Sequence, residues 1–85
     1  MYPGQARYVK LRCPVGMVNT LLDVFGKNIR FGEPTDGRVQ VQVHAAPAGV
    51  KLFALQYVDK VELLEPAELR EEIRSTLQTA LKGYQ

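Results

Sequence analysis

The sequence is poor in the residues that support redox, metal and disulfide chemistry. It contains no tryptophan, one histidine (His44) and one cysteine (Cys13) among its 85 residues. A single cysteine cannot form an internal disulfide, and the chain has no Cys/His spacing typical of a metal site. We therefore predict no disulfide, metal or other cofactor, and a reducing compartment such as the cytoplasm.

Long apolar runs and a strong charge of one sign are also missing. No apolar run approaches the roughly 18 residues that a membrane helix needs, and the N-terminus lacks a signal-peptide core. Eleven basic and nine acidic residues give a net charge of +2, which by itself is too small to indicate nucleic-acid binding. We expect no membrane contact, and a single domain in a chain of this length.

Apolar residues recur at regular spacing and predict seven helices and strands. Alternation predicts strands, a spacing of three to four residues predicts helices, and proline or glycine marks the ends. Asp36-Gly37 is a turn signal ahead of the clearest alternation, in which Val39, Val41 and Val43 face one side. The predicted elements are strand 8–13, helix 15–25, strand 28–32, strand 38–44, helix 47–57, strand 60–65 and a helix from 66 to about 82. Residues 1–6 form a lead-in, and residues 7–85 form one domain.

This order predicts an α+β fold, a ferredoxin-like β-α-β-β-α-β antiparallel sheet with an additional C-terminal α-helix. Right-handed crossovers then place the first two helices on one face of the sheet. Cys13 falls on the inward side of its strand, where a small buried hydrophobe is expected. Ile29 and Phe31 are expected to point inward from the short second strand. The helical side chains expected to cover the inward valines are Val18, Leu22, Phe25, Phe53 and Tyr57.

The C-terminal helix carries an apolar stripe that the predicted sheet does not need. Pro66 suits the first helical position, Glu68 places negative charge near the positive end of the helix, and Lys82 and Gly83 mark its end. The stripe packs at the edge of the helical layer, against an upstream domain, or against a second copy of the chain. The residues predicted to form such an interface are Leu69, Ile73, Leu77, Leu81 and Tyr84.

The sheet face without helices is predicted to be polar and mostly basic. Its residues are Lys10, Arg12, Asn28, Arg30, Arg38, Gln40, Gln42, His44 and Glu62. Charged groups buried there without partners would be costly, so the C-terminal helix is not expected to cover this face. The candidate ligand or nucleic-acid surface is Lys10, Arg12, Arg30, Arg38, Gln40 and Gln42. An ordinary solvated face is the alternative, and Tyr8 as the one outward aromatic argues against base stacking of the RNA-recognition kind.

No pair of residues suited to catalysis is evident. His44 lies at a strand end with no serine or cysteine motif nearby, so a surface role is favoured. The glycines do not have the spacing of a phosphate-binding loop. We therefore predict that the chain is not an enzyme.

The final third of the chain carries a family resemblance. Val61-Glu62-Leu63-Leu64-Glu65-Pro66, then Leu69-Arg70-Glu71 and a tyrosine near the terminus, is similar to the C-terminal extension domain of bacterial WYL-domain transcriptional regulators. Earlier parts agree as a pattern. They are Val9-Lys10-Leu11-Arg12 in the first strand, Phe25-Gly26 at the end of the first helix, and Asp36-Gly37 before the alternating strand.

The resemblance implies a regulatory and dimerising module with a ferredoxin-like fold. Such regulators usually carry an upstream helix-turn-helix that binds DNA and a central WYL domain that senses a ligand, often nucleic acid. We therefore expect a non-catalytic regulatory and oligomerisation domain from a longer bacterial regulator, a homodimer that acts on DNA only indirectly and responds to a nucleic-acid or nucleotide effector. The alternative is a stand-alone module that binds an anionic ligand or single-stranded nucleic acid on its open sheet face.

Overall fold

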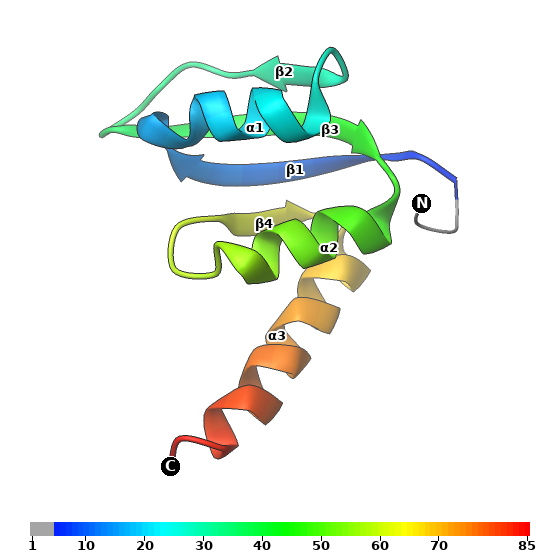
Figure 1. Ribbon diagram of the computed structural model, residues 1–85, viewed down its shortest axis with the longest axis vertical. Coiled ribbons are helices and arrows are strands. Elements are labelled where there is room, and N and C mark those ends of the chain that lie inside the picture. Colours follow the sequence, from blue (N-terminus) through cyan, green and yellow to red (C-terminus); the bar gives the residue numbers. More distant parts are fainter. Residues whose placement is uncertain (1–4) are drawn as a thin grey trace.

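A computed structural model describes residues 5–85, which contain four strands, one 3₁₀ turn and three α-helices (Figure 1). The α+β class predicted from the sequence is confirmed. Residues 1–4 of the predicted lead-in lie outside the described range. The elements are β1 (Arg7–Pro14), the 3₁₀ turn (Val15–Met17), α1 (Val18–Phe25), β2 (Ile29–Phe31), β3 (Arg38–Ala45), α2 (Pro47–Gln56), β4 (Glu62–Glu65) and α3 (Ala67–Lys82).

The four strands form one antiparallel sheet in the order β2-β3-β1-β4. The longest pairing joins β1 to β3, from Arg7 opposite Ala45 to Pro14 opposite Arg38. In Figure 1, α1 and α2 both lie on the same side of the sheet. The opposite face is therefore left open, as the sequence predicted.

The core lies between the sheet and the helices. Val39, Val41 and Val43 are buried from β3, and Cys13 is fully buried from β1, all as predicted. Their burial follows from strand alternation, because every second side chain points to the same face. Leu22 was expected beneath the valines but is 41% exposed, and its neighbour Leu21 is fully buried instead. The whole core is Val9, Leu11, Cys13, Met17, Leu21, Val39, Val41, Val43, Val50, Phe53, Ala54, Val61, Leu63, Leu69 and Ile73.

The hairpin ahead of β3 closes at Asp36 and Gly37, both of which have positive φ angles, 54° and 77°. Thr35 and Arg38 flank these two residues, and each donates its backbone N–H to the carbonyl of the other. Two central residues with positive φ are what a type I′ turn requires, and Asp-Gly adopts it readily. The turn predicted from the sequence is confirmed.

Several element ends differ from the predicted ones. The first helix opens with a 3₁₀ turn, and β2 and β4 are shorter than expected. Pro66 precedes α3 in an extended conformation, so it is not the first helical residue, and Ala67 takes that place. Phe31 faces the inner side opposite Val41 but remains 40% exposed, because β2 is the outermost strand on its side of the sheet.

The long helix α3 starts beside β4 and contacts both β4 and α2. It does not cross the open face of the sheet. Figure 1 shows it leaving the edge of the sheet at β4, with its C-terminal end pointing away from the other elements. This placement divides the helix into an anchored first half and a projecting second half.

Candidate regulatory and binding surfaces

The apolar stripe of α3 becomes steadily more exposed along the helix. Leu69 is 3% exposed and Ile73 is 9% exposed, whereas Leu77 is 40%, Leu81 56% and Tyr84 90% exposed. Leu69 and Ile73 were predicted to belong to an interface, but they are part of the domain's own core. That prediction is wrong for these two residues, because the first two turns of α3 pack against β4 and α2. It stays a prediction for Leu77, Leu81 and Tyr84.

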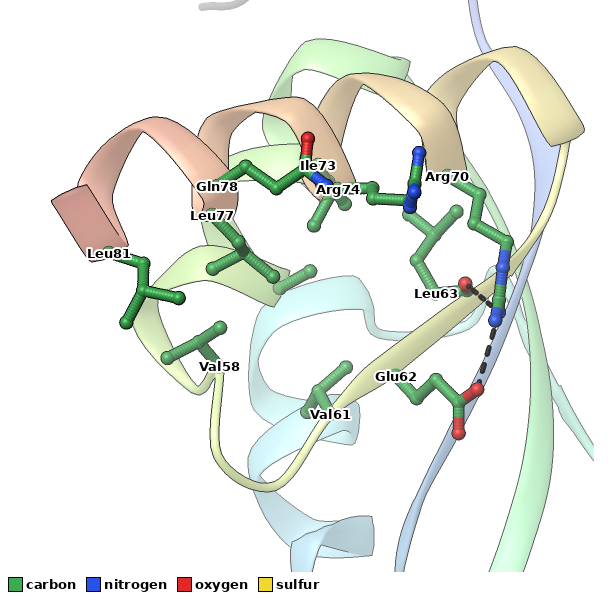
Figure 2. Close-up of a pocket in the computed structure, with 11 residues that line it drawn as sticks. Val58, Val61, Glu62, Leu63, Arg70, Ile73, Arg74, Leu77, Gln78 and Leu81 are labelled. Carbon is green, nitrogen blue, oxygen red and sulfur yellow. Dashed lines mark hydrogen bonds and ion pairs between the residues drawn. The ribbon is translucent and has the colours of Figure 1, made fainter.

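The exposed half of the stripe borders an open groove of about 380 Å³. Its apolar residues come from α3, from β4 and its approach, and from the end of α2 and the loop that follows. Figure 2 shows Leu77 and Leu81 of α3 facing Val58 across this groove. The residues that line it are Ala54, Val58, Val61, Glu62, Leu63, Arg70, Ile73, Arg74, Leu77, Gln78 and Leu81.

Ion pairs from three elements hold the first half of α3 in place. Arg7 of β1 pairs with Glu68 at 3.2 Å, and Lys51 of α2 pairs with Glu72 at 3.5 Å. The third pair, at 3.2 Å, joins Arg70 to Glu62 of β4. No ion pair to another element involves a residue after Glu72 in the described part of the chain. The charges and the apolar contacts therefore anchor the same end of the helix.

The open face brings together all six residues predicted as a ligand surface. Across the strands, Gln42 of β3 lies opposite Arg30 of β2 on one side and opposite Lys10 of β1 on the other. Gln40 lies opposite Arg12, and Arg38 is two residues further along β3. Residues directly opposite in an antiparallel pair point to the same face. Gln42 thus lies between basic side chains on both sides, and Gln40 has Arg12 on one side and Gly32 on the other.

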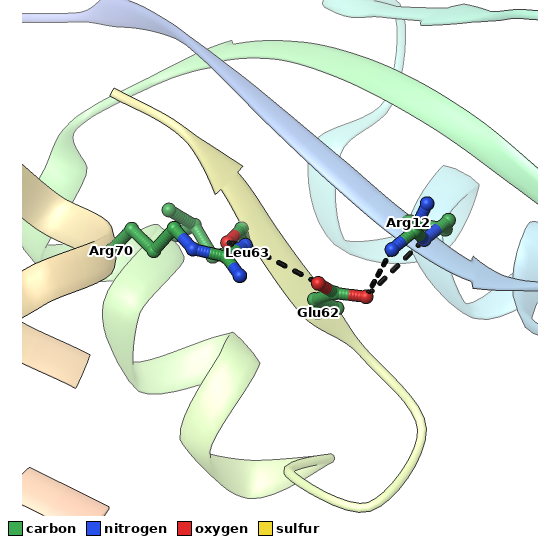
Figure 3. Close-up of polar contacts among 4 residues, drawn as sticks. All are labelled: Arg12, Glu62, Leu63 and Arg70. Carbon is green, nitrogen blue, oxygen red and sulfur yellow. Dashed lines mark hydrogen bonds and ion pairs between the residues drawn. The ribbon is translucent and has the colours of Figure 1, made fainter. Parts of the chain in front are cut away.

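Two basic residues of β1, Lys10 and Arg12, are engaged by carboxylates of β4. Arg12 donates from Nε and Nη2 to Oε1 of Glu62, at 3.2 and 2.7 Å. Arg70 donates from Nη1 to the other oxygen, Oε2, at 3.2 Å, and also to the backbone carbonyl of Leu63 at 2.9 Å. Figure 3 shows Glu62 bridging the two guanidinium groups. One carboxylate therefore connects the open face to α3.

A second ion pair depends on an irregularity in β4. Lys10 pairs with Glu65 at 3.4 Å. Glu62 and Glu65 are three residues apart, so in a regular strand they would point to opposite faces. The register between β1 and β4 shifts at Lys10, which places Glu65 opposite Lys10 and Leu63 opposite Leu11, with one extra residue in β4. Such a β-bulge redirects the following side chains, and here both carboxylates reach the open face.

The cluster affects the titration of Glu62. The hydrogen bonds from Arg12 lower the pKa of the Glu62 carboxyl. Partial desolvation raises this pKa, and the hydrogen bond from Arg70 lowers it further. Elsewhere on the sheet, burial raises the pKa of the Cys13 thiol, and the nearby charge of Arg38 opposes this. A buried thiol with a raised pKa has little thiolate character.

The remaining predicted surface residues are less constrained. Arg30 and Arg38 form no ion pair with any residue in the range 5–85. His44 is exposed and lies 4.6 Å from Tyr8, centroid to centroid, in a tilted ring contact on the open face. Asn28 is exposed before β2, and its carbonyl accepts the His44 N–H at 3.0 Å.

Sequence reasoning missed Arg70, Glu65 and Val58 as residues of these surfaces. Helical spacing alone does not tell which neighbour Arg70 meets, and no local signal marks the bulge that redirects Glu65. Within residues 5–85, no three His, Cys, Asp or Glu side chains lie close enough together to hold a metal ion. In the same range, no helix is long and apolar enough to cross a membrane.

Comparison with known proteins decides the family. A protein-family model described as the WCX domain matches residues 3–81. The chain belongs to the WCX family. No curated protein matches the sequence.

The WCX domain is the C-terminal extension of WYL-domain regulators, so the resemblance stated from the sequence is confirmed. WCX membership places the chain among the regulatory domains of WYL-type transcriptional regulators, which usually have other domains.

Proposed function

We propose that the chain is a non-enzymatic regulatory domain of a bacterial WYL-type transcriptional regulator that forms a homodimer through the second half of α3. Membership of the WCX family supports the regulatory role. The observation that carries the interface is the rise in exposure along one apolar stripe, from 3% at Leu69 to 56% at Leu81. DNA reading would belong to an upstream helix-turn-helix domain, so this domain acts on DNA indirectly, in the cytoplasm.

The proposal includes a ferredoxin-like topology. Read from its other edge, the strand order is β4-β1-β3-β2, and the element order up to β4 is β-α-β-β-α-β. Both features are consistent with a split β-α-β arrangement to which α3 has been added.

A second copy of the chain suits the groove for a physical reason. Leu77 and Leu81 project from α3, and Val58 supplies an apolar wall beside them. In a two-fold dimer the same patch must meet itself, so the surface must be self-complementary. A projecting leucine pair next to an apolar groove meets that requirement, because the leucines of one protomer can occupy the groove of its partner.

Equilibrium sedimentation of the chain tests the homodimer. We expect the wild type to self-associate with increasing concentration and both Leu77→Asp and Leu81→Asp to shift it to monomer, because a buried carboxylate without a partner is costly. Val24→Asp on α1 is the matched control, since Val24 is 56% exposed, as Leu81 is, but lies on another element. Its self-association should equal that of the wild type.

Two results would contradict the homodimer. One is a wild-type chain that stays monomeric at the highest concentration reached. The other is a dimer that Val24→Asp weakens as much as Leu81→Asp does, since the effect would then be one of charge rather than position.

A second candidate function is the binding of an anionic ligand or single-stranded nucleic acid on the open face. It is favoured by the arrangement of Lys10, Arg12 and Arg30 around Gln40 and Gln42. Cations beside amide donors suit phosphate oxygens, which accept hydrogen bonds from both. A nucleotide or nucleic-acid effector would bind through the same groups.

Titration with a short oligothymidylate at low and high salt tests this second function. We expect binding that weakens as salt rises, because cations are released from the nucleic acid when basic side chains replace them. Replacing Arg30 with Glu should reduce the affinity, whereas replacing Arg74 with Glu, on the α3 groove, should not. Equal losses for both variants would argue for a general charge effect and against a site on the open face.

A further inference from the structure

Two neighbouring recesses lie on the open face and have two lining residues in common. The first, of about 220 Å³, is lined by Lys10 and Arg30, with Gln42 between them. The second, of about 610 Å³, is lined by Arg12 and Arg38, and Gln40 and Gly32 border both recesses. The second also has Glu33 and Asp36 on its walls, whereas the first has no acidic residue. An anion is therefore best placed over the first recess and the Gln40 side chain.

The carboxylates of β4 already hold two of the basic side chains that such an anion would need. Glu65 pairs with Lys10, and Glu62 pairs with Arg12. The Arg12 and Glu62 side chains are 41% and 37% exposed, so solvent reaches this pair. Exposed ion pairs are weak, and a phosphate group can compete with them. The two glutamates are thus internal competitors of an external anion.

Only one of the two competitors is connected to α3. Glu62 divides its oxygens between Arg12 and Arg70, whereas Glu65 pairs with Lys10 and with no other cation in residues 5–85. Two guanidinium groups that share one carboxylate weaken each other's contact with it. If Arg12 turns to another anion, Glu62 is free to direct both oxygens to Arg70.

We propose that a phosphate group bound over Gln40 and Gln42 takes Arg12 from Glu62, and that the released carboxylate then holds Arg70 and the first half of α3 more firmly against β4. This inference rests on the second function proposed above, an open face that binds anions. Coupling of this kind is reciprocal, so any partner that fixes α3 against β4 also raises the affinity of the open face for phosphate. The open face and the α3 groove then act as two linked sites.

The size of the coupling follows from the strength of one exposed ion pair. Removing the internal competitor should tighten phosphate binding by about two- to fivefold, the range that an exposed pair supports. Both Glu62→Gln and Glu65→Gln remove a competitor and should tighten binding. Only Glu62→Gln also removes the connection to Arg70, which makes Glu65→Gln the matched control.

The experiment is an NMR titration of the wild type and both variants with inorganic phosphate, repeated with a short oligothymidylate. The backbone amide of Gln42 reports binding. The side-chain Nε–H of Arg70 reports the relay, by which we mean the transfer of the Glu62 carboxylate from Arg12 to Arg70. We expect the Arg70 signal to respond to the probe in the wild type and in Glu65→Gln but not in Glu62→Gln. Binding of phosphate assigns the site to small phosphate ligands, and binding of the oligonucleotide alone assigns it to a nucleic-acid backbone.

The outcomes separate the relay from the site. Neither probe binding to the wild type overturns both the anion-binding open face and the relay. Equal affinity of the wild type and Glu62→Gln, or an Arg70 response that persists in Glu62→Gln, overturns the relay and leaves the site standing. Thermal unfolding monitored by circular dichroism verifies that both variants are folded, so that a changed affinity reports the site.

Discussion

At the scale of single residues, Glu62 has the largest number of charged partners in the described chain. It joins two arginines from different elements, Arg12 of β1 and Arg70 of α3, which are 58 positions apart in the sequence, from residue 12 to residue 70. The arrangement satisfies both carboxylate oxygens and one backbone carbonyl, that of Leu63, in the edge strand β4. An unprotected strand edge invites pairing with other chains, and Arg70 partly covers this one.

The stability contributed by Glu62 should depend on pH. The pKa of its carboxyl is lowered in the folded state, chiefly by Arg12, from an ordinary value of 4.5. A lowered folded-state pKa means that the contribution is present above the unfolded value and is lost as pH falls through the folded value. A double-mutant cycle with Glu62→Gln and Arg12→Gln should give a coupling of at most about 1 kcal/mol at neutral pH, because the pair is partly exposed.

Urea unfolding of the four proteins of this cycle at a series of pH values provides the measurement. The coupling should be constant from neutral pH down to about the ordinary carboxyl pKa and then shrink toward zero. A coupling that persists unchanged well below that pH would mean that the contact is not an ion pair.

At the scale of elements, the hairpin between β2 and β3 is positioned by local sequence, whereas the helix α3 is positioned by tertiary contacts. The hairpin is fixed locally, because its turn depends on the positive φ angles of Asp36 and Gly37. The position of α3 is fixed by contacts with β4 and α2 and by ion pairs with residues far away in the sequence, Arg7 and Lys51.

The turn should be sensitive to the loss of its glycine. Gly37→Ala is expected to destabilise the domain by about 1 kcal/mol or more, because alanine is strained at a φ of 77°. Gly16→Ala is the control, since Gly16 has no positive φ and no atom within 4 Å of an added Cβ. Thermal or urea unfolding should show the control within about 0.5 kcal/mol of the wild type. Equal losses for both would contradict the turn assignment.

At the scale of the whole molecule, one core connects every layer. Buried residues come from β1, α1, β3, α2, β4 and the first half of α3. The second half of α3 contributes none, and its apolar side chains Leu77 and Leu81 are exposed. The domain thus combines a cooperative body with a helical extension held only at its base.

Hydrogen exchange should reveal this division. We expect the slowest amides in the central strands β1 and β3, for example those of Leu11 and Val41, and the fastest helical amides in α3 after Leu77. Measurement on the dilute, monomeric chain checks this, and raising the concentration should protect the end of α3 if dimerisation occurs there. Uniform protection along α3 in the dilute chain would contradict the division.

The sequence by itself determined which residues of the central strand β3 point inward and where its hairpin turn falls. Alternation identified Val39, Val41 and Val43, and Asp36-Gly37 identified the hairpin, because these signals act over a few neighbouring residues. It also carried the family resemblance, at the step from Glu65 to Pro66. Which of two adjacent leucines in α1 is buried could not be read from spacing, because Leu21 and Leu22 both fit the same helical face.

The tertiary structure alone decided which part of the C-terminal helix is buried and which carboxylates reach the open face. Leu69 and Ile73 are core residues because β4 and α2 lie against the first turns of α3, whereas Leu77 and Leu81 pass beyond the sheet. The bulge in β4 brings Glu65 to Lys10, and the packing of α3 brings Arg70 to Glu62. Lys10 and Glu65 are distant in the chain, and Glu62 and Arg70 belong to different elements whose packing sets their contact, so no local pattern of the sequence encodes either pair.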